Sequence, residues 1–187
     1  IQRMHQHDSY FFNLMNDKPR RLAEELLEEE VVPKNLQYFN KPPLLGVETP
    51  PHQDGYYFML KPCHAITMWL ALDTADEENG CVRYIKGSHK HGMRLHKRTS
   101  PLGFSQGIRD FGAQDDMANE IVCHAKPGDL LAHQAMTIHR ADRNRSSSRN
   151  RRALGFIFYG ASAKENIEAH QIYKSKLDKE LTLKGKI

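Results

Sequence analysis

Residues 65–72 have the sequence AITMWLAL, an eight-residue run without a charged side chain. Alternate residues of an extended strand point to opposite faces, which gives two largely apolar sets here: Ala65, Thr67, Trp69 and Ala71 against Ile66, Met68, Leu70 and Leu72. A strand of this kind is covered on both sides. The run therefore predicts a sheet in the interior of the fold.

Further short strands are predicted on both sides of this run. They are KNLQYFN, YYFML, EIVCHA, GDLLAHQ and ALGFIFYG, with turns at Asn79-Gly80 and Gly87-Ser88. Helices are predicted near the ends: an amphipathic one over residues 20–32 that Pro33 terminates, and a final one that opens with a capping box of Ser162 and Glu165. Many short strands between flanking helices favour a mainly β fold, a sandwich or jelly roll.

The chain has 187 residues, of which 39% are hydrophobic and 27% charged, a composition typical of one globular domain. We expect that domain to span residues 1–187 and to lack part of an N-terminal region, because the sequence begins with Ile1 instead of Met. The three cysteines form no CxxC pair, and no run approaches the roughly 20 apolar residues of a membrane span. We expect a reducing, cytoplasmic compartment and no membrane partner.

The net charge of +4 is only mildly basic, and the densest basic run, RADRNRSSSRNRR at residues 140–152, suits a solvated, serine-rich loop. We therefore expect no nucleic-acid partner. From His91 to about Asn119 no periodicity persists, which predicts a long loop that could act as a lid. Its basic residues point to an anionic substrate, although a solvated surface loop would have the same composition: Arg94, Lys97, Arg98 and Arg109.

The segment PPHQDGYYF, residues 50–58, contains a histidine and an aspartate two positions apart. In a strand, His52 and Asp54 would point to the same face and could reach one metal ion. Imidazole and carboxylate together suit iron, zinc or manganese. The pair is weak evidence alone, because this spacing is frequent by chance.

A third ligand is expected at His139, which ends the stretch GDLLAHQAMTIH. Two histidines and one carboxylate form the facial triad of non-haem Fe(II) oxygenases, which leaves coordination positions free. Downstream, Arg151 and Arg152 lead into an apolar strand, and a guanidinium there is costly unless it pairs with an anion.

The alternation of this last strand distinguishes the two arginines. Arg151 shares its face with Ala153 and Gly155, small residues that leave room for a ligand. Arg152 shares its face with bulky residues that would pack under a helix, so a salt bridge or solvent would satisfy it. We predict Arg151 as the anion-binding residue.

Four segments together resemble the phytanoyl-CoA dioxygenase family: PPHQDGYYF, MWLALDTADEENGCVRYIKGSHKHG, KPGDLL and TIHRADRNRSSSRNRRALGF. Members of that family are Fe(II)- and 2-oxoglutarate-dependent oxygenases on a double-stranded β-helix. The resemblance covers about residues 34–162, which would be the core of the domain, followed by a C-terminal helix at about 163–184.

The resemblance implies that His52, Asp54 and His139 bind Fe(II) and that Arg151 binds the distal carboxylate of 2-oxoglutarate. Trp69 matches a family tryptophan near the cosubstrate, with plain core packing as the alternative. More loosely, the resemblance implies that Gln37 and Lys41 face the pocket. The sequence departs from the family pattern at two places. Ala141 replaces a small hydroxyl residue, and one additional residue before the arginines leaves open whether Arg151 or Arg152 binds 2-oxoglutarate.

The implied reaction consumes O2 and 2-oxoglutarate, releases succinate and CO2, and hydroxylates an aliphatic C–H of a small molecule, either an anionic one or an acyl-CoA. Because Asp54 retains its carboxylate, hydroxylation is expected instead of halogenation. Two alternatives remain: a cupin-like metal enzyme that needs no 2-oxoglutarate, and a non-catalytic binding module. Iron content separates the module from the enzymes, and 2-oxoglutarate dependence separates the two enzymes.

Overall fold

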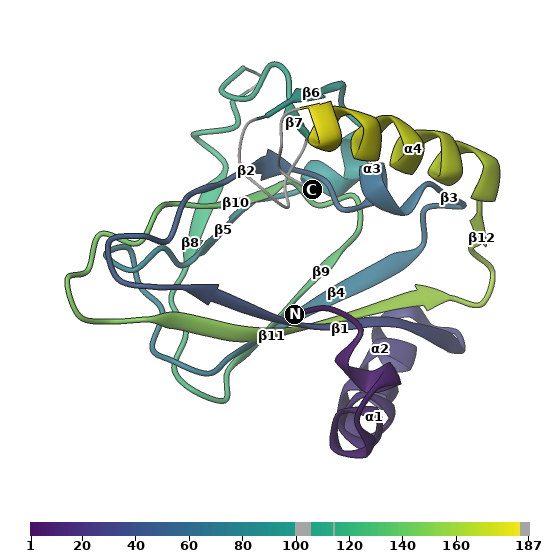
Figure 1. Ribbon diagram of the computed structural model, residues 1–187, viewed down its shortest axis with the longest axis horizontal. Coiled ribbons are helices and arrows are strands. Elements are labelled where there is room, and N and C mark those ends of the chain that lie inside the picture. Colours follow the sequence, from purple (N-terminus) through teal and green to yellow (C-terminus); the bar gives the residue numbers. More distant parts are fainter. Residues whose placement is uncertain (100–105, 114, 184–187) are drawn as a thin grey trace.

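The computed structural model describes residues 1–99, 106–113 and 115–183. Two four-stranded antiparallel sheets face each other (Figure 1). Sheet A has the order β1 (Val31–Lys41), β11 (Arg151–Gly160), β4 (Ala65–Ala71) and β9 (Leu130–Gln134). Sheet B has the order β2 (Thr49–His52), β10 (His139–Ala141), β5 (Val82–Ile85) and β8 (Glu120–Cys123). This confirms the predicted mainly β, jelly-roll architecture.

The remaining elements lie around the two sheets (Figure 1). Near the N-terminus these are η1 (Met4–Gln6), α1 (Ser9–Asn16) and α2 (Lys18–Leu27). Elsewhere they are α3 (Gly55–Phe58), β3 (Leu60–Lys61), η2 (Ser88–His91), β6 (His96–Arg98), β7 (Gln106–Ile108), β12 (Lys164–Glu165) and α4 (Ile167–Leu183). No helix among the described residues is both long and apolar enough to cross a membrane.

The alternation of β11 divides its side chains between two cores. Leu154, Phe156 and Phe158 are buried with residues of α1 and α2, which cover the outer face of sheet A. Ala153 is buried in the other direction, beside Trp69, in the space between the sheets. The prediction that the bulky set packs under helices is therefore confirmed, and the small set faces the interior of the sandwich.

The predicted helix end at Pro33 is wrong. Helix α2 already ends at Leu27, because Glu28 adopts a left-handed conformation with φ 57°. Pro33 lies in β1, where the register shifts between Pro33 and Asn35. Strand β1 is at the edge of its sheet, and an edge strand tolerates a residue without an N–H donor.

The predicted strand YYFML is wrong over most of its length. Residues Gly55–Phe58 form the single turn α3, in which the amides of Tyr57 and Phe58 donate to the carbonyl oxygen of Asp54. Gly55 also donates to the carbonyl oxygen of Ala135 at 2.9 Å. These contacts fix a turn in a segment whose aromatic composition alone favours a strand.

The predicted capping box of Ser162 and Glu165 does not form. The Ser162 hydroxyl donates to Glu29 at 2.8 Å, and Glu165 lies in β12 and pairs with Lys34. The amide of Ala169 instead donates to the side chain of Asn166. The stretch predicted as one long loop also contains a hairpin, in which β6 pairs antiparallel with β7.

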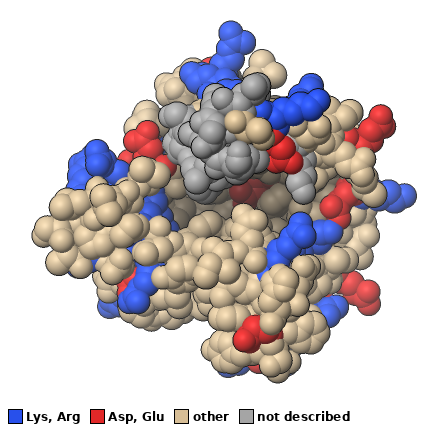
Figure 2. Space-filling view, viewed as in Figure 1, with Lys and Arg blue, Asp and Glu red and all other residues tan. Residues whose placement is uncertain are grey.

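Three of the six arginines of the basic run 140–152 are ion-paired instead of simply solvated. Arg140 pairs with Glu120 at 2.6 Å, Arg149 pairs with Asp76, and Arg152 pairs with Asp73 at 2.7 Å. On the face drawn in Figure 2, Lys and Arg side chains lie in several separate groups with acidic side chains near them.

Replacing Phe156 by Ala tests the helix-covered core. The ring is fully buried, so Phe156→Ala should lower the free energy of unfolding by about 3–5 kcal/mol, measured by denaturant unfolding. Phe12→Ala is the matched control because Phe12 is 54% exposed on α1, and it should change stability by about 0.5 kcal/mol or less. Equal effects of the two substitutions would contradict this account of the core.

Candidate metal centre

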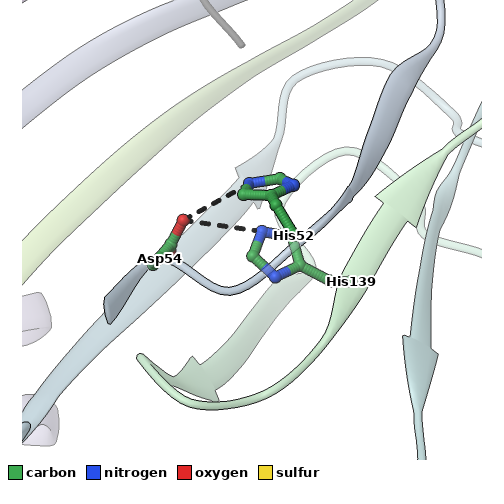
Figure 3. A group of neighbouring side chains, drawn as sticks. All are labelled: His52, Asp54 and His139. Carbon is green, nitrogen blue, oxygen red and sulfur yellow. Dashed lines mark ion pairs between the residues drawn. The ribbon is translucent and has the colours of Figure 1, made fainter. Parts of the chain in front are cut away.

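Two side chains that are close in the sequence and a third that is distant converge between the sheets (Figure 3). His52, Asp54 and His139 each offer one ligand atom, and these atoms lie within 4.8 Å of one another. The Nε2 atoms of His52 and His139 are 3.5 and 3.7 Å from Oδ1 of Asp54. Two atoms bound to one ion at about 2.0–2.2 Å lie at most about 4.4 Å apart, so the carboxylate–imidazole distances fit a shared metal ion.

Strand pairing in sheet B brings the two histidines together. His139 of β10 lies in register with His52 of β2, and their ring centroids are 4.1 Å apart. Asp54 is not in a strand: β2 ends at His52, and Asp54 has helical dihedral angles before α3. The prediction that strand alternation places His52 and Asp54 on one face is therefore wrong, although the Asp54 carboxylate does lie beside both histidines.

Both histidines are oriented with Nε2 toward the centre. Nδ1 of His52 lies 2.8 Å from the carbonyl oxygen of Pro50, and Nδ1 of His139 lies 3.0 Å from that of Thr137. A carbonyl oxygen only accepts, so each Nδ1 carries the proton and each Nε2 presents a lone pair. Backbone carbonyls commonly fix metal-binding histidines in this way.

Burial and neighbouring charges set the protonation states. Burial lowers the pKa of His139 well below its usual value, and His52 and His133 lower it further. Burial alone would raise the pKa of Asp54, but its neighbours His139, His133 and His52 hold it well below its usual range. The His139 imidazole is therefore neutral and the Asp54 carboxylate is ionised, and with His52 they form a donor set suited to a divalent transition metal.

A third histidine, His133, lies at the centre and was missed in the sequence. Nε2 of His133 is 3.1 Å from Oδ2 of Asp54, and the Thr67 hydroxyl donates to the same oxygen at 2.6 Å. Both residues lie inside predicted strands: Thr67 is a polar residue in an apolar run, and His133 stands beside Gln134 at the end of GDLLAHQ. Thr67 and His133 lie opposite each other in neighbouring strands, and this could have identified them only if the order of the strands in the sheet were known.

The two candidate arginines have opposite environments. Arg152 is half exposed and is bound by Asp73 through two short hydrogen bonds. Arg151 is 4% exposed, its Nε has no hydrogen-bond partner, and no carboxylate within the described part of the chain forms an ion pair with it. Burial lowers the pKa of Arg151 to about 10, and its guanidinium lies 5.2 Å from the centroid of the Trp69 ring.

Lys41 is a second buried cation beside Arg151. The two residues lie opposite each other in the β1–β11 register. The Lys41 ammonium donates to the carbonyl oxygens of Val47 at 2.6 Å and Asp142 at 2.8 Å. Burial, followed by the charge of Arg151, lowers the pKa of Lys41 to about 7, and Asp142 and Glu48 partly offset that decrease. Two adjacent buried cations form a region that would favour an anion.

Gln37 lies on the same strand as Lys41, but its surroundings are different. Its side chain accepts a hydrogen bond from Asn35 at 3.2 Å and packs against the position of Gly155. A Cβ atom at Gly155 would lie 2.6 Å from the Phe39 ring, so this position requires glycine on steric grounds. Ala141 is buried at the end of β10 and has no hydroxyl to offer.

The basic residues of the 91–119 segment do not all remain available to an anionic substrate. Arg94 is largely buried and bound by Asp116 at 2.8 Å and by Asp110 at 2.8 Å. That arginine therefore stabilises the segment. Lys97 and Arg109 are exposed. The part of the predicted lid at residues 100–105 lies outside the described residues.

Comparisons with known proteins show the family to which this chain is related. The sequence profile of the phytanoyl-CoA dioxygenase family matches residues 2–153. Phytanoyl-CoA dioxygenase domain-containing protein 1 of Bos taurus is 31% identical over 143 residues, which covers 74% of this chain and 48% of that protein. The chain spans about half the length of the curated relatives it matches.

Solved structures show the same fold. The non-heme monooxygenase ThoJ aligns with a TM-score of 0.74 and 20% identity over 88% of this chain and 60% of its own. EvdO2 from Micromonospora carbonacea var. aurantiaca, complexed with 2-oxoglutarate, aligns with a TM-score of 0.67 and 26% identity over 88% of this chain and 67% of its own. The family match and this double-stranded β-helix fold together place the chain in the phytanoyl-CoA dioxygenase family.

Proposed function

We propose that this chain carries the catalytic centre of an Fe(II)- and 2-oxoglutarate-dependent oxygenase that hydroxylates an aliphatic C–H bond of a small molecule. His52, Asp54 and His139 would hold the iron, and Arg151 would hold the distal carboxylate of 2-oxoglutarate. The iron, when bound, supplies the activation of O2: one oxygen atom enters succinate as CO2 leaves, and the other enters the substrate C–H bond.

The buried Arg151 is the observation that carries this proposal. A guanidinium taken out of water without an acidic partner is costly, so its environment indicates that an anion belongs beside it. A metal enzyme that used no 2-oxoglutarate would have no need of this cation. The structure of EvdO2 with 2-oxoglutarate, from a related fold, supports 2-oxoglutarate as that anion.

The chain's own residues would divide the binding work. The three ligand atoms lie within 4.8 Å of one another, and a triad of this kind would leave coordination positions for a chelating cosubstrate and for O2. Trp69 packs against the Arg151 guanidinium and would keep it oriented toward the site. By family membership, acyl-CoA thioesters are the first substrate class that we propose to screen.

Replacing each of the two adjacent arginines by Ala tests the cosubstrate assignment. Anaerobic titration of 2-oxoglutarate into the Fe(II)-loaded protein should produce a metal-to-ligand charge-transfer band. Arg151→Ala should weaken 2-oxoglutarate binding by about 2–5 kcal/mol, roughly 30-fold or more, because a buried charge pair is lost. Arg152→Ala is the control, and should leave that affinity within about twofold because its guanidinium is exposed and bound to Asp73.

Any of three results would contradict the proposed function. Iron binding without a charge-transfer band would favour a cupin-like metal enzyme. Equal losses in the two variants would mean that Arg151 has no special role. Absence of iron binding in the wild-type protein would favour a non-catalytic module.

Lys41 should give 2-oxoglutarate binding a pH dependence. With a pKa of about 7 the free protein loses the Lys41 proton as pH rises, whereas a bound dianion beside Arg151 favours the protonated form. Binding therefore takes up a proton, and the affinity should fall above pH 7 by up to about tenfold per pH unit. Charge-transfer titrations from pH 6.5 to 8.5 measure this slope.

Lys41→Met is the comparison for that slope. It removes the titrating group and should bind 2-oxoglutarate more weakly at pH 6.5, with a flatter dependence on pH. The pH dependence that remains in the variant comes from all other titrating groups, so the difference between the two slopes is the contribution of Lys41. Identical slopes in the two proteins would contradict a role for Lys41.

A further inference from the structure

The two carboxylate oxygens of Asp54 have different neighbours. Oδ1 faces Nε2 of His52 at 3.5 Å and Nε2 of His139 at 3.7 Å. Oδ2 points away from them, toward the Thr67 hydroxyl at 2.6 Å and Nε2 of His133 at 3.1 Å. One oxygen is therefore presented to the metal ligands, and the other is already occupied by two hydrogen bonds.

The residues on Oδ2 form a cross-strand pair of sheet A. Thr67 of β4 lies directly opposite His133 of β9, and both are buried on the inner face. The candidate ligands His52 and His139 come from sheet B, on the other side of Asp54. The carboxylate is thus held by one sheet while it faces the imidazoles of the other.

Tyr84 fixes the proton position on His133. A carboxylate only accepts, so Nε2 of His133 must carry the proton that reaches Asp54. Nδ1 is then the acceptor, and the Tyr84 hydroxyl lies 3.0 Å from it. Burial raises the pKa of Tyr84, which keeps this hydroxyl protonated as a donor. Tyr84 lies in sheet B, in register with His139, so its hydrogen bond to His133 connects sheet B with sheet A.

We propose that Thr67, His133 and Tyr84 form a carboxylate clamp that makes Asp54 a one-oxygen metal ligand. Without the clamp, the carboxylate could rotate and chelate the metal with both oxygens, and it would then occupy a position that the cosubstrate or O2 needs. The ligand atoms of His52, Asp54 and His139 lie within 4.8 Å of one another, and His133 does not belong to this group. We therefore treat His133 as a positioning residue and not as a fourth ligand. The inference rests on the proposed metal site, but not on the identity of the substrate.

Anaerobic Fe(II) titration without 2-oxoglutarate tests the clamp by metal affinity alone. His133→Phe removes the donor to Oδ2 and should weaken Fe(II) binding by about 10–100-fold, as loss of a residue that orients a ligand commonly does. His133→Gln should recover most of that affinity, because an amide N–H can donate to the same oxygen. His124→Gln is the matched control on an exposed histidine and should bind Fe(II) like the wild type.

A second pair of variants separates the clamp from a general packing effect. Thr67→Val keeps the side-chain shape, loses the hydroxyl, and should weaken Fe(II) binding, whereas Thr67→Ser should restore it. With 2-oxoglutarate added, the charge-transfer band of Thr67→Val should shift or lose intensity, since the carboxylate then competes for a coordination position. Thermal unfolding of each variant checks that it is folded.

The outcomes distinguish the clamp from other roles of His133. Folded His133→Phe and Thr67→Val proteins that bind Fe(II) like the wild type would overturn the clamp. A loss in His133→Gln as large as that in His139→Ala would also overturn it, because His133 would then be a metal ligand. Wild-type protein that binds Fe(II) but not 2-oxoglutarate would refute the proposed function, while the Fe(II) affinities would still decide the clamp.

Discussion

A largely buried carboxylate that both sheets share is the constraint on which this molecule depends. Asp54 lies between a histidine pair from sheet B and a Thr–His pair from sheet A, and its charge is satisfied only if both sheets face each other in the observed register. The same arrangement lowers the pKa of Asp54, despite burial, so the carboxylate is ionised and ready to bind a cation. Fold and site are therefore linked by one side chain.

Arg151 is the complementary case, a buried cation for which the described residues provide no acidic partner. Such a residue lowers stability in the free protein, and the anionic ligand that we propose would complete it. Lys41 beside it strengthens the preference of this region for an anion, because a second buried cation raises the local positive potential. In the proposed complex, 2-oxoglutarate would lie between the candidate metal ligands and these two cations.

The sequence predicted the parts of the fold that depend on side-chain alternation. Strand β4 and the two faces of β11 follow from apolar periodicity, and the three candidate ligands follow from residue type and order. It failed where a tertiary contact determines a local structure, as at Pro33 in an edge strand and at the α3 turn after Asp54. His133 was missed for a related reason, since its partner Thr67 is 66 positions away and only strand pairing brings them together.

The most direct test of the central claim is an anaerobic crystal structure of the protein with Fe(II) and 2-oxoglutarate. The account predicts iron bound by His52, His139 and a single oxygen of Asp54, with the distal carboxylate of 2-oxoglutarate on the Arg151 guanidinium. A metal ion at the triad with 2-oxoglutarate absent, or bound away from Arg151, would contradict it.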